Sequence, residues 1–244
     1  MKLVLNTNYE SLRELITLLP TTFDTGGEVI YNARNQIKVF TLADGRKINV
    51  KRYCVPIFIN RLVYTFCRQP KAVRAYEYAA HLIELDVPTP MPIAYILEQR
   101  GGLLAYSFLI TEQSSLHNML YEFGKGTLSG REEIVKAFAR FTAGLHEKGV
   151  YHKDYSPGNI LFDVIQGVPQ FTLVDVNRME FGKVNMDKGC RNFARLWGKR
   201  DFFELIATEY ATARHFNVQQ CINLILKNRH AFWKTHDRTL YDYE

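Results

Sequence analysis

The first half of the chain alternates apolar and polar positions in short stretches, a pattern that predicts β-strands rather than helices. Stretches rich in Val, Ile, Tyr and Phe lie at 28–33, 36–42, 47–53, 93–97 and 103–111. Ala43-Asp44-Gly45-Arg46 has the composition of a hairpin turn between the second and third of them. We therefore expect an antiparallel sheet of five strands.

One helix is predicted between the third and fourth strands, from 70 to 85. Val73, Tyr76, Ala80 and Ile83 recur there at helical spacing and form a single apolar stripe. The helix would bury this stripe against the sheet.

Beyond residue 112 the apolar positions recur at helical spacing. Ser129 and Glu132 have the spacing of a capping box, and the apolar face that follows stops at Gly149, a residue typical of helix C-termini. Further elements are expected as strands at 159–162 and 171–175 around a turn at 167–169, and as helices at 193–197, 202–216 and 218–233. The polar tail from Thr235 to Glu244 is expected to be loosely ordered.

The order of elements predicts an α+β fold with two lobes. Residues 1–112 would form a five-stranded antiparallel sheet with one inserted helix, and residues 113–244 a mainly helical lobe. This is the arrangement of the protein-kinase-like fold.

Composition narrows the class of protein only slightly. An apolar fraction of 47% and a charged fraction of 23% are those of a soluble protein, and the net charge of +6 favours an anionic partner. The four cysteines form no C-x-x-C pair, so we expect neither a zinc site nor a disulfide framework. The first 20 residues lack a signal-peptide core, and the longest apolar stretch, 103–110, is too short to span a bilayer. These features predict a cytoplasmic protein.

The candidate chemistry lies in a short polar run followed by a strand. His152, Asp154 and Asn159 form the pattern H-x-D-x-x-x-x-N, and the next strand ends in Asp175. Kinase-like phosphotransferases use such an Asp near the acceptor hydroxyl, and the Asn and the later Asp as magnesium ligands. We therefore predict Asp154 as the catalytic carboxylate and Asn159 and Asp175 as ligands of a metal on ATP. His152 is expected to brace the loop by hydrogen bonds.

The first half supplies a candidate cation for the phosphates. Lys51 lies late in the third predicted strand, where a kinase-like site needs a positive charge, and an acid from the inserted helix would orient it. Glu77 is expected to point inward with the apolar stripe, and Glu84, one heptad later, is its rival. Glu112 ends the fifth strand, where the backbone would bind the adenine edge of ATP.

Several basic residues permit two interpretations. Arg178 either holds the loop after Asp175 by pairing with a carboxylate or contacts an anionic substrate. The run of Arg191, Arg195, Lys199 and Arg200 on a predicted helix suits a phosphorylated glycolipid or an anionic membrane, or is a solvated face.

The chain resembles the lipopolysaccharide core kinases, a family of Kdo and core heptose kinases within the protein-kinase-like superfamily. The resemblance is carried by Val50-Lys51-Arg52, by Glu77 with Val87-Pro88-Thr89-Pro90 after it, by residues 152–161, and by Val174-Asp175-Val176-Asn177-Arg178. It implies ATP- and Mg²⁺-dependent phosphorylation of a sugar hydroxyl in the lipid A–core region, at the cytoplasmic face of a Gram-negative inner membrane. It implies a glycolipid or small sugar acceptor, peripheral contact with an anionic membrane surface, and no nucleic acid.

The chain also departs from common kinase patterns. The turn at 32–35 has no glycine, Val176-Asn177 replaces Phe-Gly after Asp175, and no A-P-E motif follows. Two alternatives therefore stay open at this point. One is a catalytically silent kinase-like binding module, and the other is an aminoglycoside- or choline-type small-molecule kinase.

Overall fold

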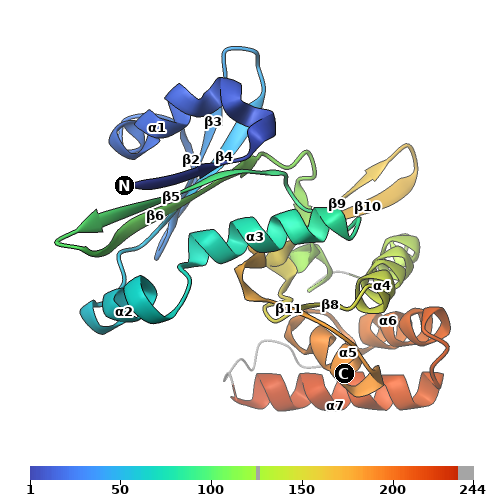
Figure 1. The fold of residues 1–244 in the computed structure, drawn as a ribbon. Helices are drawn as coiled ribbons and strands as arrows, with labels where there is room; N and C mark the ends of the chain where they lie inside the picture. The colour runs from blue at the N-terminus through green and yellow to red at the C-terminus, as the bar shows by residue number, and fades with distance from the viewer. Residues whose placement is uncertain (125–126, 236–244) are drawn as a thin grey trace. The chain divides into compact units, whose positions relative to one another are not determined.

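The computed structural model describes residues 1–124 and 127–235, without the side chain of Phe66. The tail after Thr235, for which loose order is predicted, lies outside the described residues. The chain divides into two compact units, Met1–Ser115 and Leu116–Glu244. The first is built on an antiparallel sheet and the second is mainly helical, an α+β protein-kinase-like fold (Figure 1).

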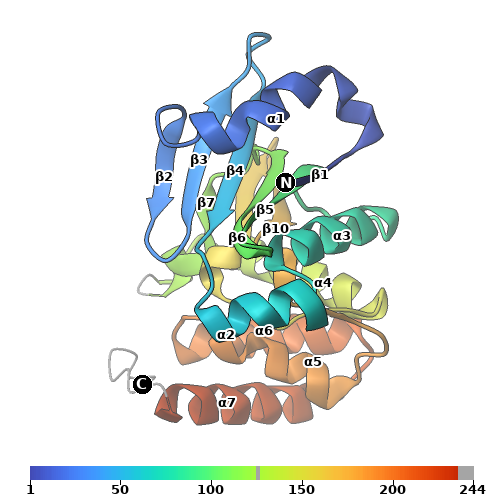
Figure 2. The ribbon, with the colours of Figure 1, turned by 60° about the vertical axis from the view of Figure 1, so that its left-hand side comes forward.

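A six-stranded antiparallel sheet forms the first unit, with the spatial order β1-β5-β6-β4-β3-β2. Its strands are β1 (Lys2–Leu5), β2 (Glu28–Asn32), β3 (Gln36–Thr41), β4 (Lys47–Tyr53), β5 (Pro92–Arg100) and β6 (Leu103–Glu112). Figure 2 shows β2, β3 and β4 side by side at one end of the sheet. The five predicted strands are confirmed. The prediction of five strands in total is wrong, because the short strand β1 pairs with β5 at the other edge.

Helices cover both faces of this sheet. The helix α1 (Arg13–Thr22), which follows the 3-10 helix η1 (Thr7–Leu12), buries Ile16 and Leu19 against Val50 and Phe108. The helix α3 (Lys71–Glu84) covers the other face, where Val73 packs with strand tyrosines. Figure 1 shows α1 and α3 on opposite faces of the sheet. Because side chains alternate along a strand, each face of the sheet has its own apolar cluster.

Between β4 and α3 lies a segment that the sequence pattern did not single out. It comprises the short helix α2 (Phe58–Leu62) and a π-helical turn, η2 (Val63–Cys67). The inserted helix α3, predicted over 70–85, is confirmed.

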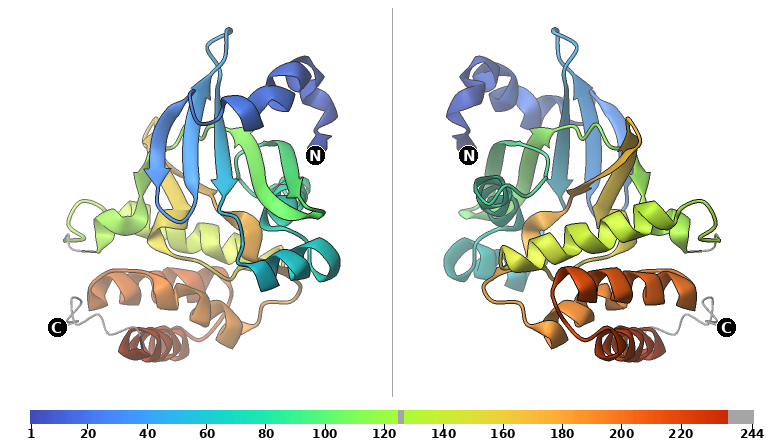
Figure 3. Two further views of the ribbon diagram at one scale, coloured as in Figure 1. Left: turned by 90° about the vertical axis from the view of Figure 1, so that its left-hand side faces the viewer. Right: turned by 90° about the vertical axis from the view of Figure 1, so that its right-hand side faces the viewer.

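Among its described residues, the second unit has four α-helices and four short 3-10 helices. The helical elements there are η3 (Leu120–Phe123), α4 (Glu132–Glu147), η4 (Pro157–Asn159), η5 (Val176–Arg178), α5 (Met186–Asn192), η6 (Phe193–Arg195), α6 (Arg200–Ala213) and α7 (Val218–Thr235). Figure 3 shows α4 in yellow-green and α7 in red on either side of α6. Fully buried aromatic side chains, including Phe138, Phe193, Phe203 and Tyr210, fill the space between these helices.

The start of α4 differs from the prediction. Gly130 adopts a left-handed backbone with φ of 78°, and the helix begins two residues later, at Glu132. Ser129 therefore lies in a turn, no side chain caps the helix, and the predicted capping box is wrong. The predicted stop is confirmed, since Gly149 has φ of 71° directly after the C-cap Lys148.

Short strands frame the loop of the candidate motif. These strands are β7 (Asn118–Met119), β8 (Val150–His152), β9 (Ile160–Ile165), β10 (Val168–Leu173) and β11 (Met179–Phe181). The turn between β9 and β10 is at Gln166-Gly167, where both residues have positive φ, one residue earlier than predicted. Pro169 is accommodated in β10 because this is an edge strand.

Within the described residues, no helix is both long enough and apolar enough to cross a bilayer.

Candidate active site

The loop after β8 is held in shape by contacts on both sides of Asp154. Tyr155 is fully buried, with its hydroxyl 2.8 Å from that of Thr142 on α4. The Asn159 amide nitrogen donates to the backbone oxygen of Asp154 at 2.8 Å, and its own backbone N–H donates to Ser156. The spacing of five residues between Asp and Asn is therefore a structural requirement, because the Asn side chain closes the loop that presents the Asp.

Strand pairing brings Asn159 and Asp175 together. Ile160 at the start of β9 lies opposite Leu173 at the end of β10. The backbone N–H of the next residue, Val174, donates to the backbone oxygen of Asn159 at 3.0 Å. Asp175 then takes a left-handed backbone with φ of 54°, and the Asn177 amide donates to its carboxylate. Asn177 is buried, and its part in orienting Asp175 was not foreseen from the sequence.

Two arginines bind the carboxylate of Asp154. Arg195 donates from Nη1 to Oδ1 at 2.7 Å, and Arg178 lies 3.4 Å from Oδ2. The guanidinium of Arg195 also lies 5.0 Å from the ring centre of Phe232 on α7, which limits its freedom. Of the two roles considered for Arg178, pairing with a carboxylate is the one seen here. The carboxylate is that of Asp154 itself.

His152 braces the loop through both ring nitrogens. Its Nδ1 accepts from the backbone N–H of Asp154 at 3.0 Å, and Nε2 lies 3.3 Å from the backbone oxygen of Val174. With these partners the ring carries a proton on Nε2 and none on Nδ1, so it is neutral. Burial lowers the pKa of the His152 ring, which favours this neutral form. The expected bracing role of His152 is confirmed.

Behind the loop, a chain of buried polar groups connects three helices to β8. The imidazole of His146 on α4 lies 2.8 Å from the Tyr210 hydroxyl on α6 and 3.0 Å from the Asn192 amide oxygen on α5. The amide nitrogen of Asn192 donates in turn to the His152 backbone oxygen at 2.9 Å. The loop that presents Asp154 is therefore fixed to the core of the second unit.

This chain of groups predicts acid sensitivity. Burial lowers the pKa of His146 to about 4, whereas the pKa of a histidine in an unfolded chain is about 6.5. The unfolded state therefore binds protons first below pH 6.5, and the free energy of unfolding should fall as the pH drops. The loss from His146 should be about 2 kcal/mol between pH 7 and pH 5. Urea denaturation at several pH values measures it.

The matched variants for that test are His146→Gln and His117→Gln. Removing the titrating ring at position 146 should reduce the pH dependence of unfolding, although His152 contributes a loss of the same sign. His117 is an exposed histidine of the same unit, and its replacement is the control for the substitution itself. An unaltered slope in His146→Gln would contradict the assignment.

In the first unit, Lys51 is nearly buried. Its side chain is 9% exposed and belongs to the sheet face that α3 covers, with its ammonium 5.2 Å from the ring centre of Tyr53. Lys47, four residues earlier on the same strand, is exposed. The burial of Lys51 sets it apart from an ordinary solvated strand lysine.

The predicted orientation of Glu77 is wrong. The buried residues of α3 are Ala72, Val73, Ala75, Ala79 and Leu82, so the buried face is rotated from the predicted stripe. Glu77 is exposed and accepts a hydrogen bond from the Gln69 amide at 3.4 Å, while its rival Glu84 pairs with His81 at 3.0 Å. Whether either acid orients Lys51 stays a prediction.

Glu112 at the end of β6 already has partners. Its carboxylate accepts from the Tyr9 hydroxyl at 2.7 Å, and burial, together with this hydrogen bond, raises the pKa of the Tyr9 phenol. The backbone N–H groups of Glu112 and Gln113 donate to Met91 and Lys47. A backbone donor for adenine would therefore come from a residue after Gln113.

The basic run at 191–200 does not form one helix face. Arg191 is near the end of α5, Arg195 ends η6, and α6 begins at Arg200. Arg195 points to Asp154, and Arg200 pairs with Glu204 at 2.7 Å. The prediction of one continuous basic helix is therefore wrong, and one of its arginines belongs to the candidate site.

The donor set of the site suits a hard cation. Among the described residues, no three His, Cys, Asp or Glu side chains gather as a metal site. The adjacent pair Asn159 and Asp175 instead offers one amide oxygen and one carboxylate. Mg²⁺ uses few protein oxygens and keeps water and phosphate oxygens as its other ligands, so this pair fits it.

Comparisons with known proteins agree with this geometry. The family model described as lipopolysaccharide kinase (Kdo/WaaP) family matches residues 29–220, well over half of the chain. A solved structure of WaaP in complex with acyl carrier protein is similar, with a TM-score of 0.65, 18% identity, and coverage of 99% of this chain and 100% of that one. The amicoumacin kinase hAmiN, solved with AMP-PNP and Ca²⁺, has a TM-score of 0.56 at 10% identity, with 97% and 91% covered. The comparison with curated proteins gave no match. The chain belongs to the lipopolysaccharide kinase (Kdo/WaaP) family.

Proposed function

We propose that this kinase uses Mg²⁺-ATP to phosphorylate a sugar hydroxyl, of Kdo or heptose, in the lipid A–core region of lipopolysaccharide. Family membership makes the chain an ATP-using kinase that acts on the lipopolysaccharide core. The observation that carries the proposal is the loop in which Asp154 is held by two arginines while Asn159 and Asp175 lie side by side.

Asp154 would orient the acceptor hydroxyl and take its proton. In the reaction the acceptor oxygen bonds to the γ-phosphorus of ATP, the bond from that phosphorus to the bridging oxygen breaks, and ADP leaves. The proton passes late to the Asp154 carboxylate. Asn159 and Asp175 would hold Mg²⁺, which when bound neutralises charge on the phosphates. Most of the rate enhancement would come from positioning and charge.

The charges around Asp154 support an acidic acceptor. Arg178 and Arg195 bring two positive charges to the one carboxylate of Asp154, so this cluster of three side chains has a formal net charge of +1. Side chains of Asp154 and Arg195 are partly exposed and that of Arg178 is more so, which lets a substrate reach them. Phosphates and acidic sugars of the lipid A–core region are suitable partners for guanidinium groups.

Lys51 would bind the inner phosphates of ATP, with Glu77 or Glu84 as its orienting acid after a movement of α3. The backbone after Gln113 would bind adenine. We further propose that the protein works at the cytoplasmic face of a Gram-negative inner membrane, where the acceptor is assembled.

Transfer of labelled γ-phosphate from ATP to purified lipid A–core tests the proposal. Mass spectrometry of the product should place one added phosphate on a core sugar. Binding of Mg²⁺-ATP without transfer would support the silent module, and transfer only to aminoglycosides or choline would support the small-molecule kinase. The family match favours the lipopolysaccharide kinase over both.

Replacing Lys51 with Met should lower kcat/KM for ATP by about a hundredfold, because a phosphate would lose its cation in a site of low dielectric constant. Lys47→Met is the matched control, since Lys47 lies on the same strand but is exposed. Equal losses in the two variants would contradict the role of Lys51, and steady-state kinetics with varied ATP distinguish the outcomes.

A further inference from the structure

The segment of α2 and η2 presents an apolar surface to solvent. Exposure is 70% for Ile57, 64% for Phe58 and 69% for Ile59, and Leu62 and Val63 are exposed as well. Helices of soluble proteins usually bury such side chains. A contiguous run of exposed apolar residues of this kind marks an interaction surface.

Polar contacts fix this segment to the sheet. The guanidinium of Arg61 donates to the backbone oxygens of Leu104 and Arg100 at 2.8 and 3.1 Å, and the Leu104 N–H donates to the Thr65 hydroxyl at 3.0 Å. Figure 1 shows α2 beside the hairpin end of β5 and β6. Because polar groups make the attachment, the apolar side chains are left facing outward. Their exposure is therefore a built feature of the unit.

Basic residues predominate in the chain around this segment. Residues 45–76 contain eight Lys or Arg and no Asp or Glu. Arg68 is exposed directly after η2, and Lys71 and Arg74 in the first turn of α3 are partly exposed. The next acid along the chain, Glu77, is exposed and accepts a hydrogen bond from Gln69. Apolar side chains next to an excess of cations suit a surface that is both apolar and anionic.

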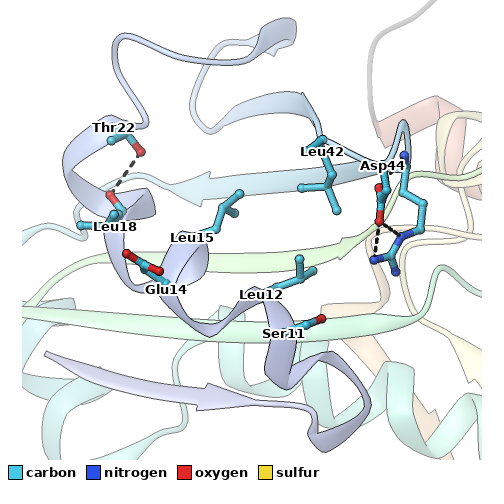
Figure 4. Close-up of a pocket in the computed structure, with 10 residues that line it drawn as sticks. Ser11, Leu12, Glu14, Leu15, Leu18, Thr22, Leu42 and Asp44 are labelled. Atoms are coloured by element: carbon cyan, nitrogen blue, oxygen red, sulfur yellow. Dashed lines mark hydrogen bonds and ion pairs between the residues drawn. The ribbon is translucent and has the colours of Figure 1, made fainter.

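A second apolar surface of the same unit lacks this charge bias. Figure 4 shows a groove lined by Leu12, Leu15, Leu18 and Leu42, with Asp44 at one end. Its volume is about 610 Å³. Glu14 also lines it, and the carboxylate of Asp44 is paired with Arg46 at 2.7 Å. Leu15 and Leu18 are exposed and thus serve as a matched comparison.

We propose that the α2 segment docks on a membrane surface that contains anionic lipids. Ile57, Phe58 and Ile59 enter the boundary between headgroups and acyl chains, and Arg68 and Lys71 contact the headgroups. The purpose we assign to this docking rests on the proposed function, because the kinase would reach a lipid-linked acceptor at a membrane surface. The docking itself requires neither ATP nor turnover.

Co-sedimentation with vesicles tests this docking. The wild-type protein should bind phosphatidylcholine vesicles that contain about 30% phosphatidylglycerol. Its binding to vesicles of pure phosphatidylcholine, and its binding to the mixed vesicles at high salt, should be much weaker. Phe58→Ser combined with Ile59→Ser should weaken binding at least about tenfold. Leu15→Ser combined with Leu18→Ser should bind like the wild type. Thermal unfolding checks that each variant is folded, and Arg68→Glu provides an independent loss of affinity for the anionic vesicles.

Three results would overturn the docking proposal. In the first, the Phe58→Ser/Ile59→Ser variant binds the anionic vesicles as well as the wild type does. In the second, the two double variants are weakened equally. In the third, the wild type binds an acidic protein such as acyl carrier protein but binds neither kind of vesicle. An assay of phosphate transfer to a deacylated, soluble acceptor tests the proposed function without requiring membrane docking. Vesicle binding without transfer would count against the kinase substrate only, whereas transfer without vesicle binding would count against the docking only.

Discussion

Replacing Asp154 with Asn is expected to lower kcat by about a thousandfold. The amide has the size of the carboxylate but cannot take the proton of the acceptor hydroxyl. It also leaves Arg178 and Arg195 without their anionic partner at 3.4 and 2.7 Å, which adds to the loss by weakening the orientation of the side chain. Single-turnover transfer from labelled ATP measures the chemical step directly.

Asp163→Asn is the matched control for this change. Asp163 on β9 is another partly buried carboxylate of the second unit, and it accepts hydrogen bonds from His117 and Asn118. Its replacement should leave kcat within about a factor of two, because it lies outside the motif. The affinity of Asp154→Asn for ATP should stay near that of the wild type. A fall in kcat of less than about tenfold would remove Asp154 from the proton-accepting role.

Replacing Asp175 with Asn should raise the Mg²⁺ concentration needed for half-maximal activity and lower kcat/KM for ATP by about a hundredfold or more. Asn is the right probe because it tolerates the left-handed backbone at this position, where Ala would add strain. The higher Mg²⁺ requirement and the lower kcat/KM would then result from the loss of one charged carboxylate oxygen and not from backbone strain. Calorimetric titration of ATP with and without Mg²⁺ supplies a binding measurement independent of turnover.

Asp187→Asn provides the comparison for Asp175→Asn. Asp187 is an exposed acid in the first turn of α5, so its replacement changes the net charge equally without touching the motif. Its Mg²⁺ dependence should match that of the wild type. If Asp175→Asn bound Mg²⁺-ATP as tightly as the wild type, Asp175 would not be a metal ligand.

Strands were the most predictable part of the fold. The stretch 47–53 coincides with β4 because Ile48, Val50 and Tyr53 are β-branched or aromatic residues placed among polar ones. By contrast, β1 spans four residues at an edge, too short for a periodic signal. The segment of α2 was missed for another reason. Its apolar residues are exposed, so they do not follow the pattern of a helix that packs on a core.

The candidate site was predictable where its residues are close in sequence. Asp154 and Asn159 belong to one loop, and Asp175 follows the paired strand, so local spacing identified them together. Arg195 lies 41 residues from Asp154 and meets it only through the packing of helices. Glu77 was misplaced because Val73, Tyr76 and Ala80 suggested one buried face, whereas the smaller residues Ala75 and Ala79 face the sheet. Small residues are weak indicators of a helix face in sequence.

The polar chain behind the loop has a direction. The guanidinium of Arg214 donates to the Tyr210 hydroxyl at 3.1 Å, which in turn donates to His146. His146 then donates to the Asn192 oxygen, and Asn192 to the backbone of His152. Every donor points the same way, away from a permanent cation, so each bond polarises the next. The hydroxyl proton of Tyr210, the tautomer of His146 and the orientation of the Asn192 amide are thereby set by one arginine, and none of them can reverse alone.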